Sequence, residues 1–177
     1  METIYIEKIR DLKKNLEEIE TKLKVKLIFN GRLVTIEGDS LDEYEASIVI
    51  DAIGFGFSTK RALTLKDPEL IFRKLNIKAF TRRKNLREVR ARVIGEKGRT
   101  KRTIEEISNS NIILNENQNQ VGIIGSAESI ETATQALTNL IRGTKQANIY
   151  RFLEKMNAAK KMDYSTVSIK NRKNKKE

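Results

Sequence analysis

The sequence contains no cysteine and no histidine among its 177 residues. Without cysteine the chain can form no disulfide bond and offers no thiol nucleophile, and most zinc sites are excluded as well. Without histidine it lacks the commonest general base and the central residue of a Ser-His-Asp triad. Carboxylates could still bind Mg²⁺, but no tight group of Asp and Glu stands at the end of an expected strand. These absences favour a binding protein over an enzyme.

Long apolar runs are also absent. The most apolar stretch, residues 46–57, is interrupted by Asp51, and no run reaches the roughly 18 residues that a transmembrane helix needs. The first residues lack the basic-then-apolar arrangement of a secretory signal, so a cytoplasmic location without a membrane partner is expected. Aromatic residues make up only 6% of the chain. Stacking of nucleic-acid bases on aromatic side chains is therefore not expected to dominate binding.

What the chain has in excess is positive charge, with a formal net charge of +11 and a pI near 9.8. Residues 1–59 carry 8 basic and 12 acidic side chains, whereas residues 78–102 carry 11 basic and 2 acidic ones. A concentrated basic segment is typical of nucleic-acid binding, although such a run can also be no more than a solvated helix face. The basic residues of this segment are Lys78, Arg82, Arg83, Lys84, Arg87, Arg90, Arg92, Lys97, Arg99, Lys101 and Arg102.

The first half of the chain shows alternating helix and strand patterns. Asn30-Gly31 lies between two apolar runs and predicts a tight hairpin turn, because both residues tolerate positive φ. Asp39 or Ser40 can cap the helix that follows. The expected elements are a short strand at 4–6, a helix at 7–22, strands at 25–29 and 33–36, and a helix from about 40 to 53.

The second half repeats these patterns after a break at residues 54–58. Asp67-Pro68 could start a helix, but we favour a strand over residues 70–77. Gly143 is expected to end the last long helix of the domain. The other expected elements are a short helix at 61–65, helices at 85–94 and 99–108, strands at 112–114 and 121–124, and helices at 129–142 and 150–156.

The two halves match at an offset of 87 to 88 residues, which indicates an internal repeat. We therefore expect an α+β chain with two domains of one fold, each a small antiparallel sheet with helices packed on one face. The expected boundaries are a first domain at 1–58, a linker at 59–68, a second domain at 69–158 and a basic, disordered tail at 159–177. The matched pairs are Leu16 and Ile104, Ile19 and Ile107, Val25 and Ile113, Ile36 and Ile123, Gly38 and Gly125, Ala46 and Ala133, Ile50 and Leu137, and Ile53 and Leu140.

The second unit carries Gly95-Glu96-Lys97-Gly98 between two expected helices. A lone G-x-x-G is a weak signal, but the order helix, G-x-x-G, helix, strand, turn, strand, helix resembles a type I KH domain, whose loop clamps four single-stranded nucleotides. Glycines let phosphates approach closely, and the start of a helix offers free N–H groups. The alternative is that the glycines only cap two helices. The residues expected to contact RNA are Arg87, Arg90, Arg92, Ile94, Gly95, Glu96, Lys97, Gly98, Arg99, Lys101 and Arg102, with Ile112 or Ile113 as a further apolar wall.

The first unit departs from the KH pattern, because residues 10–15 contain no glycine and the unit is acidic. We interpret it as a degenerate KH-like domain with a protein-binding or structural role. This degenerate unit, the Gly-Phe-rich junction at 54–58 and the stretch from Arg90 to Lys101 together resemble the two-KH ribosome-assembly family known as partner of Nob one. The ending from Gly143 to Leu153 is similar to that family as well. Ala91 departs from the small glycine expected there, and missing tail extensions indicate an archaeal-type member.

The resemblance implies a non-catalytic RNA-binding protein of small ribosomal subunit assembly. The second KH domain would bind single-stranded rRNA near the 3′ end of the small-subunit rRNA. The implied protein partners are the Nob one endonuclease, the rRNA adenine dimethyltransferase and the initiation factor two alpha subunit. No metal and no cofactor is implied.

Three other interpretations stay open from the sequence. A generic KH adaptor in RNA decay or translation would use the same loop on messenger RNA. An RNA-processing enzyme would need a carboxylate cluster for Mg²⁺, and Glu105-Glu106 is the only nearby pair. Adjacent helical residues point about 100° apart, so these two are more readily explained as solvated side chains. A scaffold that binds only proteins would show no salt-dependent affinity for RNA.

Overall fold

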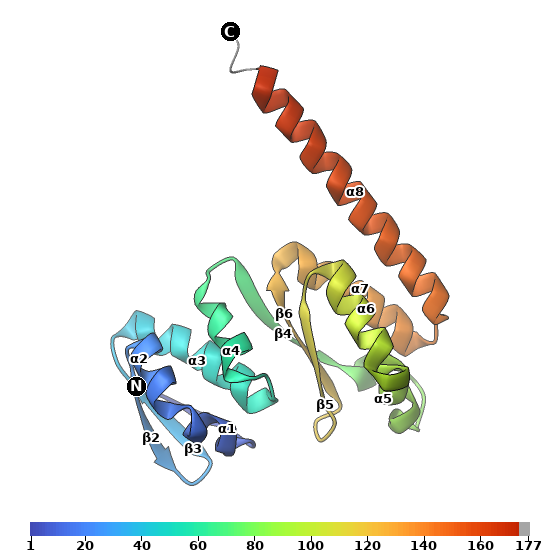
Figure 1. The fold of residues 1–177 in the computed structure, drawn as a ribbon. Coiled ribbons are helices and arrows are strands. Elements are labelled where there is room, and N and C mark those ends of the chain that lie inside the picture. Colours follow the sequence, from blue (N-terminus) through green and yellow to red (C-terminus); the bar gives the residue numbers. More distant parts are fainter. Residues whose placement is uncertain (174–177) are drawn as a thin grey trace.

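The computed structural model describes the backbone of residues 1–173 and the side chains of residues 1–162. Its first unit has a three-stranded antiparallel sheet in the order β1-β3-β2 (Figure 1). Apolar residues alternate along β3, where Val34 and Ile36 face the helices, as expected for a sheet covered on one side. The elements are β1 (Glu2–Tyr5), α1 (Ile9–Lys14), α2 (Leu16–Leu23), β2 (Lys26–Asn30), β3 (Leu33–Glu37), α3 (Ser40–Phe55), α4 (Thr59–Ala62) and a 3-10 turn, η1 (Leu63–Lys66).

The second unit has the same arrangement, with an antiparallel sheet in the order β4-β6-β5. Ser126 caps the long helix after the sheet, since its hydroxyl accepts the N–H of Ser129 at 3.2 Å, and Gly143 ends that helix in the left-handed conformation. The elements are β4 (Leu70–Asn76), η2 (Ile77–Ala79), α5 (Leu86–Ile94), η3 (Glu96–Gly98), α6 (Arg99–Ser108), β5 (Asn111–Asn115), β6 (Gln120–Ser126), α7 (Ala127–Arg142) and α8 (Gln146–Lys173).

The predicted α+β class is confirmed, with two small antiparallel sheets and helices packed against them. The strand favoured after Pro68 is also confirmed, because β4 pairs with β6 along its whole length, from Leu70 opposite Ser126 to Asn76 opposite Gln120. The alternative of a helix starting at Asp67 is wrong. Asp67 instead accepts the N–H of Glu69 at 3.0 Å, which closes a turn before the strand.

The single helix predicted for residues 7–22 is wrong, because the structure has two helices that meet at Asn15. The backbone of Asn15 leaves the helical region, with φ −113° and ψ 24°. Its side chain donates a hydrogen bond to the carbonyl of Asp11 at 2.9 Å, which competes with the regular helix ladder. The first unit therefore has two helices joined directly at Asn15, where the second unit has its glycine loop.

The first hairpin forms as predicted, but its turn is shifted by one residue. Asn30 pairs with Leu33 as the last rung of the sheet, so the two central turn residues are Gly31 and Arg32. Only Gly31 has a positive φ, at +62°. This is the requirement of a type II′ turn, in which glycine occupies the first central position.

The segments predicted as linker and as disordered tail are both helical. Residues 59–66 form α4 and η1, and Ala62, Leu63 and Leu65 are buried in the core of the first unit. The expected short helix at 150–156 is part of α8, which continues to Lys173 through the predicted disordered region. No glycine or proline interrupts residues 144–173, so nothing in the covalent chain stops the helix. Residues 174–177 of the predicted tail lie outside the described residues.

The repeat is real, but its offset changes along the chain. Gly38 and Gly125 match as predicted, and α3 and α7 correspond over their whole lengths. Before the hairpin the offset is smaller than predicted: Glu20 accepts the N–H of Leu27 at 2.8 Å, and Glu105 accepts that of Ile112 at 2.7 Å. Leu16 and Ile19 therefore do not match Ile104 and Ile107, and Val25 does not match Ile113. The reason is a longer turn in the second hairpin.

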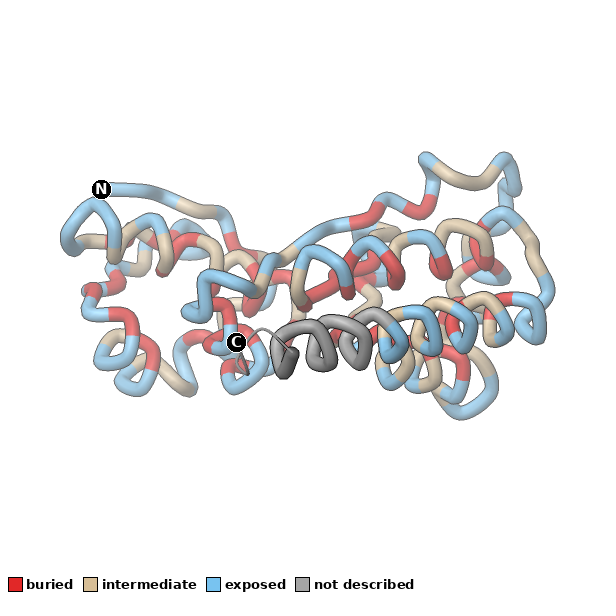
Figure 2. The backbone as a smooth tube through the Cα atoms, turned by 90° about the horizontal axis from the view of Figure 1, so that it is seen from above, coloured by how far each residue is buried: buried red, intermediate tan, exposed pale blue. Residues whose placement is uncertain are grey.

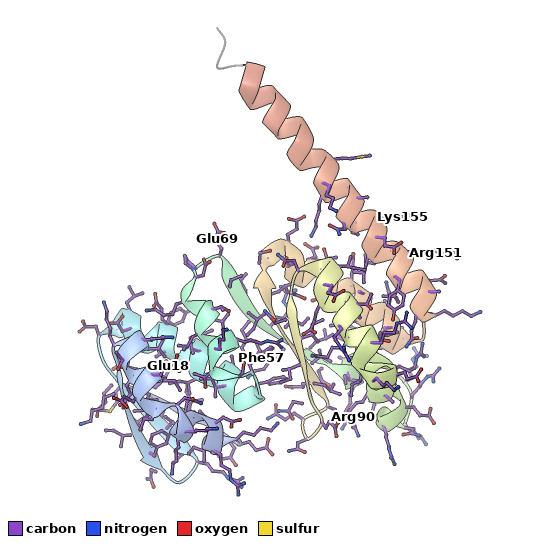
Figure 3. All side chains as sticks on the ribbon, viewed as in Figure 1. Glu18, Phe57, Glu69, Arg90, Arg151 and Lys155 are labelled. Carbon is purple, nitrogen blue, oxygen red and sulfur yellow. The ribbon has the colours of Figure 1, made fainter. Side chains whose placement is uncertain are left out.

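Two hydrophobic cores meet where the first unit covers the second sheet, and Figure 2 shows buried backbone positions in both units. Ile123 faces its own helices, whereas the neighbouring Ile124 belongs to the core of the first unit. Phe55 and Phe57 lie against Phe72 with ring centroids 5.7 and 5.8 Å apart, and Figure 3 shows Phe57 between the two units. Each unit therefore contributes apolar surface that the other one buries.

Glycine is required in the middle of β6 by this junction. A Cβ atom at Gly122 would lie 2.6 Å from the ring of Phe55 and 2.9 Å from that of Phe57. Polar contacts surround the aromatic cluster. Asn115 donates to the carbonyl of Phe55 at 3.2 Å, and Lys74 bonds to Asp51 at 2.7 Å. The two sheets thus belong to one continuously packed structure.

Candidate nucleic-acid interface

The glycine loop joins α5 to α6 at an exposed corner of the second unit. Gly95 has φ +74° and Gly98 has φ +74°, and Lys97 between them also lies in the left-handed region with φ +50°. The N–H of Gly95 is bonded to Ala91 at 2.8 Å, and that of Gly98 to Gly95 at 3.2 Å. The chain therefore reverses within four residues, and the positive end of the α6 dipole lies at the loop.

Glycine is required at the two positions for different physical reasons. A Cβ atom at Gly95 would lie 2.1 Å from Oγ1 of Thr100 and 2.8 Å from its backbone nitrogen. At Gly98 the nearest atoms would belong to the guanidinium of Arg102, 3.7 Å away. Gly95 is thus fixed by close packing and by φ, whereas Gly98 is fixed by φ alone.

Thr100 and the start of α8 hold the loop in place on its inner side. The sequence did not identify these residues as part of the site. Thr100 is buried, and its hydroxyl accepts hydrogen bonds from Gln146 at 2.9 Å and Tyr150 at 3.3 Å. Arg92 donates to the carbonyl of Thr144 at 2.9 Å. The similarity of residues 143–153 to one family was the available signal, but it did not reveal these contacts.

The predicted basic residues fall into two groups. Four of them are exposed and available to a phosphate backbone: Arg87 in the first turn of α5, and Lys97, Arg99 and Arg102 at or beside the loop. Arg102 also donates to the carbonyl of Lys97, so its guanidinium stands directly over the loop. Three others are engaged within the protein: Arg90 bonds to Asn119, Arg92 to Thr144, and Lys101 pairs with Glu105 at 3.3 Å. Figure 3 shows Arg90 at the lower edge of the second unit.

A shallow hollow of about 500 Å³ opens beside the loop. The hollow is lined by both exposed side chains of the loop, Glu96 and Lys97, and by Arg99 and Arg102. Thr103 and Glu106 complete its wall along α6. The three cations of this open hollow suit the phosphates of an RNA strand. The two carboxylates suit the hydrogen-bond donors of its sugars and bases.

The apolar wall differs from the prediction. Ile94 is half-buried at the end of α5, in the expected position. Ile112, however, is 1% exposed within the core of its own unit. Ile113 points the other way and packs against the core of the first unit. Neither Ile112 nor Ile113 is free to contact a base, because the sheet is covered on both faces.

The carboxylates of α6 do not form a metal site. Glu105 accepts the N–H of Ile112 and pairs with Lys101, so it has a structural role. Among residues 1–162, no group of three or more His, Cys, Asp or Glu is placed to hold a metal ion. Within the described chain, no helix combines the length and the apolar character needed to cross a bilayer.

The family described as the eukaryotic-type KH domain (KH-domain type I) matches residues 71–158. The chain is 32% identical over 158 residues to a KH domain-containing protein of Methanocaldococcus jannaschii, covering 86% of this chain and 68% of that protein. It is 28% identical over 162 residues to the RNA-binding protein pno1 of Dictyostelium discoideum, covering 84% of this chain and 67% of the relative.

Solved structures show the same fold. A chain of the a/eIF2alpha-aDim2p-rRNA complex from Pyrococcus horikoshii is 32% identical, with a TM-score of 0.81 over 89% of this chain and 94% of that chain. Dim2p of the same organism gives a TM-score of 0.79 at 32% identity, over 87% and 98%. A protein of unknown function from Aeropyrum pernix gives 0.83 over 97% of both chains, and at 24% identity it supports the fold alone.

Proposed function

Since the chain belongs to the Pno1/Dim2 family of KH-domain proteins, which bind RNA and are not enzymes, we propose that it grips rRNA with its second unit. The segment bound would be single-stranded and near the 3′ end of small-subunit rRNA. The protein would act without catalysis during assembly of the small ribosomal subunit. Its cytoplasmic location stays a prediction.

The loop at residues 95–98 is the observation that carries this proposal. Its backbone is held in a left-handed path by two glycines, and the exposed cations Lys97, Arg99 and Arg102 surround it. Phosphates are bound at such helix starts by N–H groups and by nearby guanidinium groups. The first unit has no such loop, since α1 and α2 are joined by the single residue Asn15.

Protein partners follow from the relatives. The Pyrococcus structure holds a/eIF2alpha together with aDim2p and rRNA, and we propose the corresponding initiation factor subunit as a partner of this chain. The Nob one endonuclease and the adenine dimethyltransferase stay predictions from the sequence resemblance. The degenerate first unit is the proposed surface for protein contacts, because its acidic side chains outnumber its basic ones, 12 to 8 over residues 1–59.

The test is binding of a single-stranded oligonucleotide from the 3′ end of small-subunit rRNA, beside a scrambled oligonucleotide, at two salt concentrations. The variant Glu96→Asp with Lys97→Asp is expected to lose the binding while remaining folded. Its matched control is Glu17→Asp with Lys14→Asp, at the corresponding helix junction of the first unit. Loss in both variants, or in neither, would refute the loop as the grip.

The scrambled RNA separates the ribosomal function from a generic KH adaptor in RNA decay or translation. Preference of the wild type for the rRNA sequence supports the ribosomal function. Equal affinity for both RNAs, with loss only in the loop variant, would leave the KH grip intact and contradict the ribosomal assignment.

A further inference from the structure

A second hollow, of about 520 Å³, lies on the other side of the second unit, between β4, α7 and α8. The glycine loop joins α5 and α6, and α6 contacts β5, whereas α7 contacts β4 at the opposite edge of the sheet. The two hollows have no lining residue in common. The second one therefore needs an explanation of its own.

The walls of the second hollow combine cations, hydrogen-bonding groups and an aromatic ring. Arg73 of β4 and Arg142 of α7 supply two guanidinium groups, and Glu131 supplies one carboxylate. Gln135 and Asn139 add amides that can donate and accept. The half-buried ring of Phe152, from α8, forms part of the same wall.

Several polar groups of this hollow are not used within the protein. Among the described side chains, neither arginine forms an ion pair and Glu131 forms none. Arg142 stands instead over the ring of Phe80, at 6.0 Å from its centroid. The hydroxyl of Thr134, which lines the hollow, is buried without a hydrogen-bond partner among the described residues.

We propose that this hollow binds a nucleotide of single-stranded RNA, outside the segment held by the glycine loop. The two guanidinium groups suit a phosphate, for which arginine provides a planar fork of donors. A carboxylate would repel a bare phosphate, but it accepts hydrogen bonds from the amino groups of bases. The amides read base edges in the same way, and the ring of Phe152 offers a surface for a base.

Arginine side chains connect the hollow with the loop. At Gly143, where α7 ends, a Cβ atom would lie 3.7 Å from guanidinium nitrogens of both Arg83 and Arg92. Arg142 adjoins this point, and Arg92 lies in the last turn of α5, just before the loop. An RNA strand leaving the loop thus meets positive charge along the end of α7 until it reaches the hollow. In this respect the inference rests on the proposed function.

The experiment compares two RNAs, a tetranucleotide and a 20-mer that contains it. The hollow variant is Arg73→Ala with Arg142→Ala, both at exposed positions. Its matched control is Arg10→Ala with Lys60→Ala, exposed cations of the first unit that remove the same charge. Affinities are measured by fluorescence anisotropy from 50 to 300 mM KCl, with circular dichroism to confirm folding.

The hollow variant is expected to bind the tetranucleotide like the wild type. It should bind the 20-mer about tenfold more weakly, with a salt slope reduced by about 0.7, since each neutralised phosphate of a single strand contributes about 0.7 and the two guanidinium groups share one phosphate. Affinity for the 20-mer equal to that of the control variant would overturn the proposal. Equal weakening for both RNAs would overturn it as well, because the substitutions would then act through the loop.

A variant of the hollow that removes no charge gives a second, independent measurement. Gln135→Ala, at an exposed position of α7, is expected to weaken the 20-mer alone, by about threefold for one lost hydrogen bond. The loop variant distinguishes the two hypotheses. If it binds the tetranucleotide normally, the loop grip fails, while selective loss of the 20-mer in the hollow variant would still support a nucleotide site here.

Discussion

The two units share one fold and differ in what has been added to it. From the start of α1 to the end of α2 the first unit uses residues Ile9–Leu23, whereas α5 to α6 spans Leu86–Ser108. Eight more residues are therefore present in the second unit, including the glycine loop. In both units, nevertheless, a glutamate of the second helix, Glu20 or Glu105, accepts a hydrogen bond from an N–H of the next strand. The fold forms without the loop in the first unit, so the loop is not required for folding.

A second addition supplies charge. Ile6 and Ile77 are buried at equivalent places, after the first strand of each unit. The next helix starts only three residues later in the first unit, at Ile9, but nine residues later in the second, at Leu86. The longer connection contains Arg82, Arg83 and Lys84. The basic character of the second unit thus resides partly in segments that the first unit does not have.

The sheets also differ in what covers their outer faces. In the second unit this face is buried under Phe55 and Phe57. In the first unit the corresponding face is open, with Tyr5, Ile28 and Leu33 exposed by 61%, 43% and 44%. The first unit therefore covers the outer face of the second sheet, whereas no described residue covers the outer face of its own sheet in the same way.

The largest loss of stability is expected from a substitution that exposes the covered face of the second sheet. Phe57→Ala removes a ring that is 1% exposed and should lower the free energy of unfolding by about 3–5 kcal/mol, the range for buried Phe to Ala substitutions. The matched change on the open sheet, Ile28→Ala, should alter it by less than about 0.5 kcal/mol. Urea denaturation monitored by circular dichroism measures both.

An effect of Phe57→Ala as small as that of Ile28→Ala would show that the first unit does not stabilise the second sheet. Two separated unfolding transitions in the wild type would contradict the shared packing as well, because a continuous core unfolds cooperatively. Phe57→Leu, which keeps most of the apolar volume, should recover about half of the lost stability or more.

The loop glycines provide the next largest contrast. Gly95→Ala places a Cβ atom against Thr100 and strains a positive φ, so it should destabilise the second unit by about 2–3 kcal/mol and abolish RNA binding. At Gly98→Ala the new Cβ atom makes only ordinary van der Waals contact with the guanidinium of Arg102, 3.7 Å away, so the substitution should cost only about 1 kcal/mol, from the φ strain alone. Thermal unfolding and RNA anisotropy are the measurements. Equal costs at the two positions would refute the close contact with Thr100.

Much of this structure could be predicted from the sequence because local signals and burial agree there. The apolar spacing of α7, its glycine end at Gly143 and the short apolar run of β6 are all readable without a structure. The loop was identified by the order of elements around it. In each of these cases the physical cause lies within a few residues of the feature itself.

The failures share a different cause, which is contact between distant segments. Ile113 looks like a groove residue in sequence, but the first unit covers it. Residues 59–66 look like a linker, yet Ala62 completes the first core. Thr100 gains its role from Gln146 and Tyr150, far along the chain. A periodic pattern states that a face is buried, but not which partner buries it.

The repeated hydrogen bond gives a smaller effect that should be the same in both units. Glu20→Ala and Glu105→Ala each leave a strand N–H without its acceptor, which should cost about 1–2 kcal/mol. Glu105 also pairs with Lys101 at 3.3 Å, so its substitution is expected to be the slightly larger of the two. Denaturation of the single and double variants measures them. No effect of Glu20→Ala would show that the structural equivalence has no energetic counterpart.

The smallest effect is expected at the polar rim between the units. Lys74 pairs with Asp51 at 2.7 Å, and its ammonium group lies 5.5 Å from the ring centroid of Phe72. Both charged side chains are partly exposed, so a double-mutant cycle with Lys74→Met and Asp51→Asn should give a coupling of about 0.5 kcal/mol. The coupling should shrink in 0.5 M salt, because exposed pairs are screened. A coupling above about 2 kcal/mol that resists salt would mean that the junction depends on this ion pair as well as on its aromatic rings.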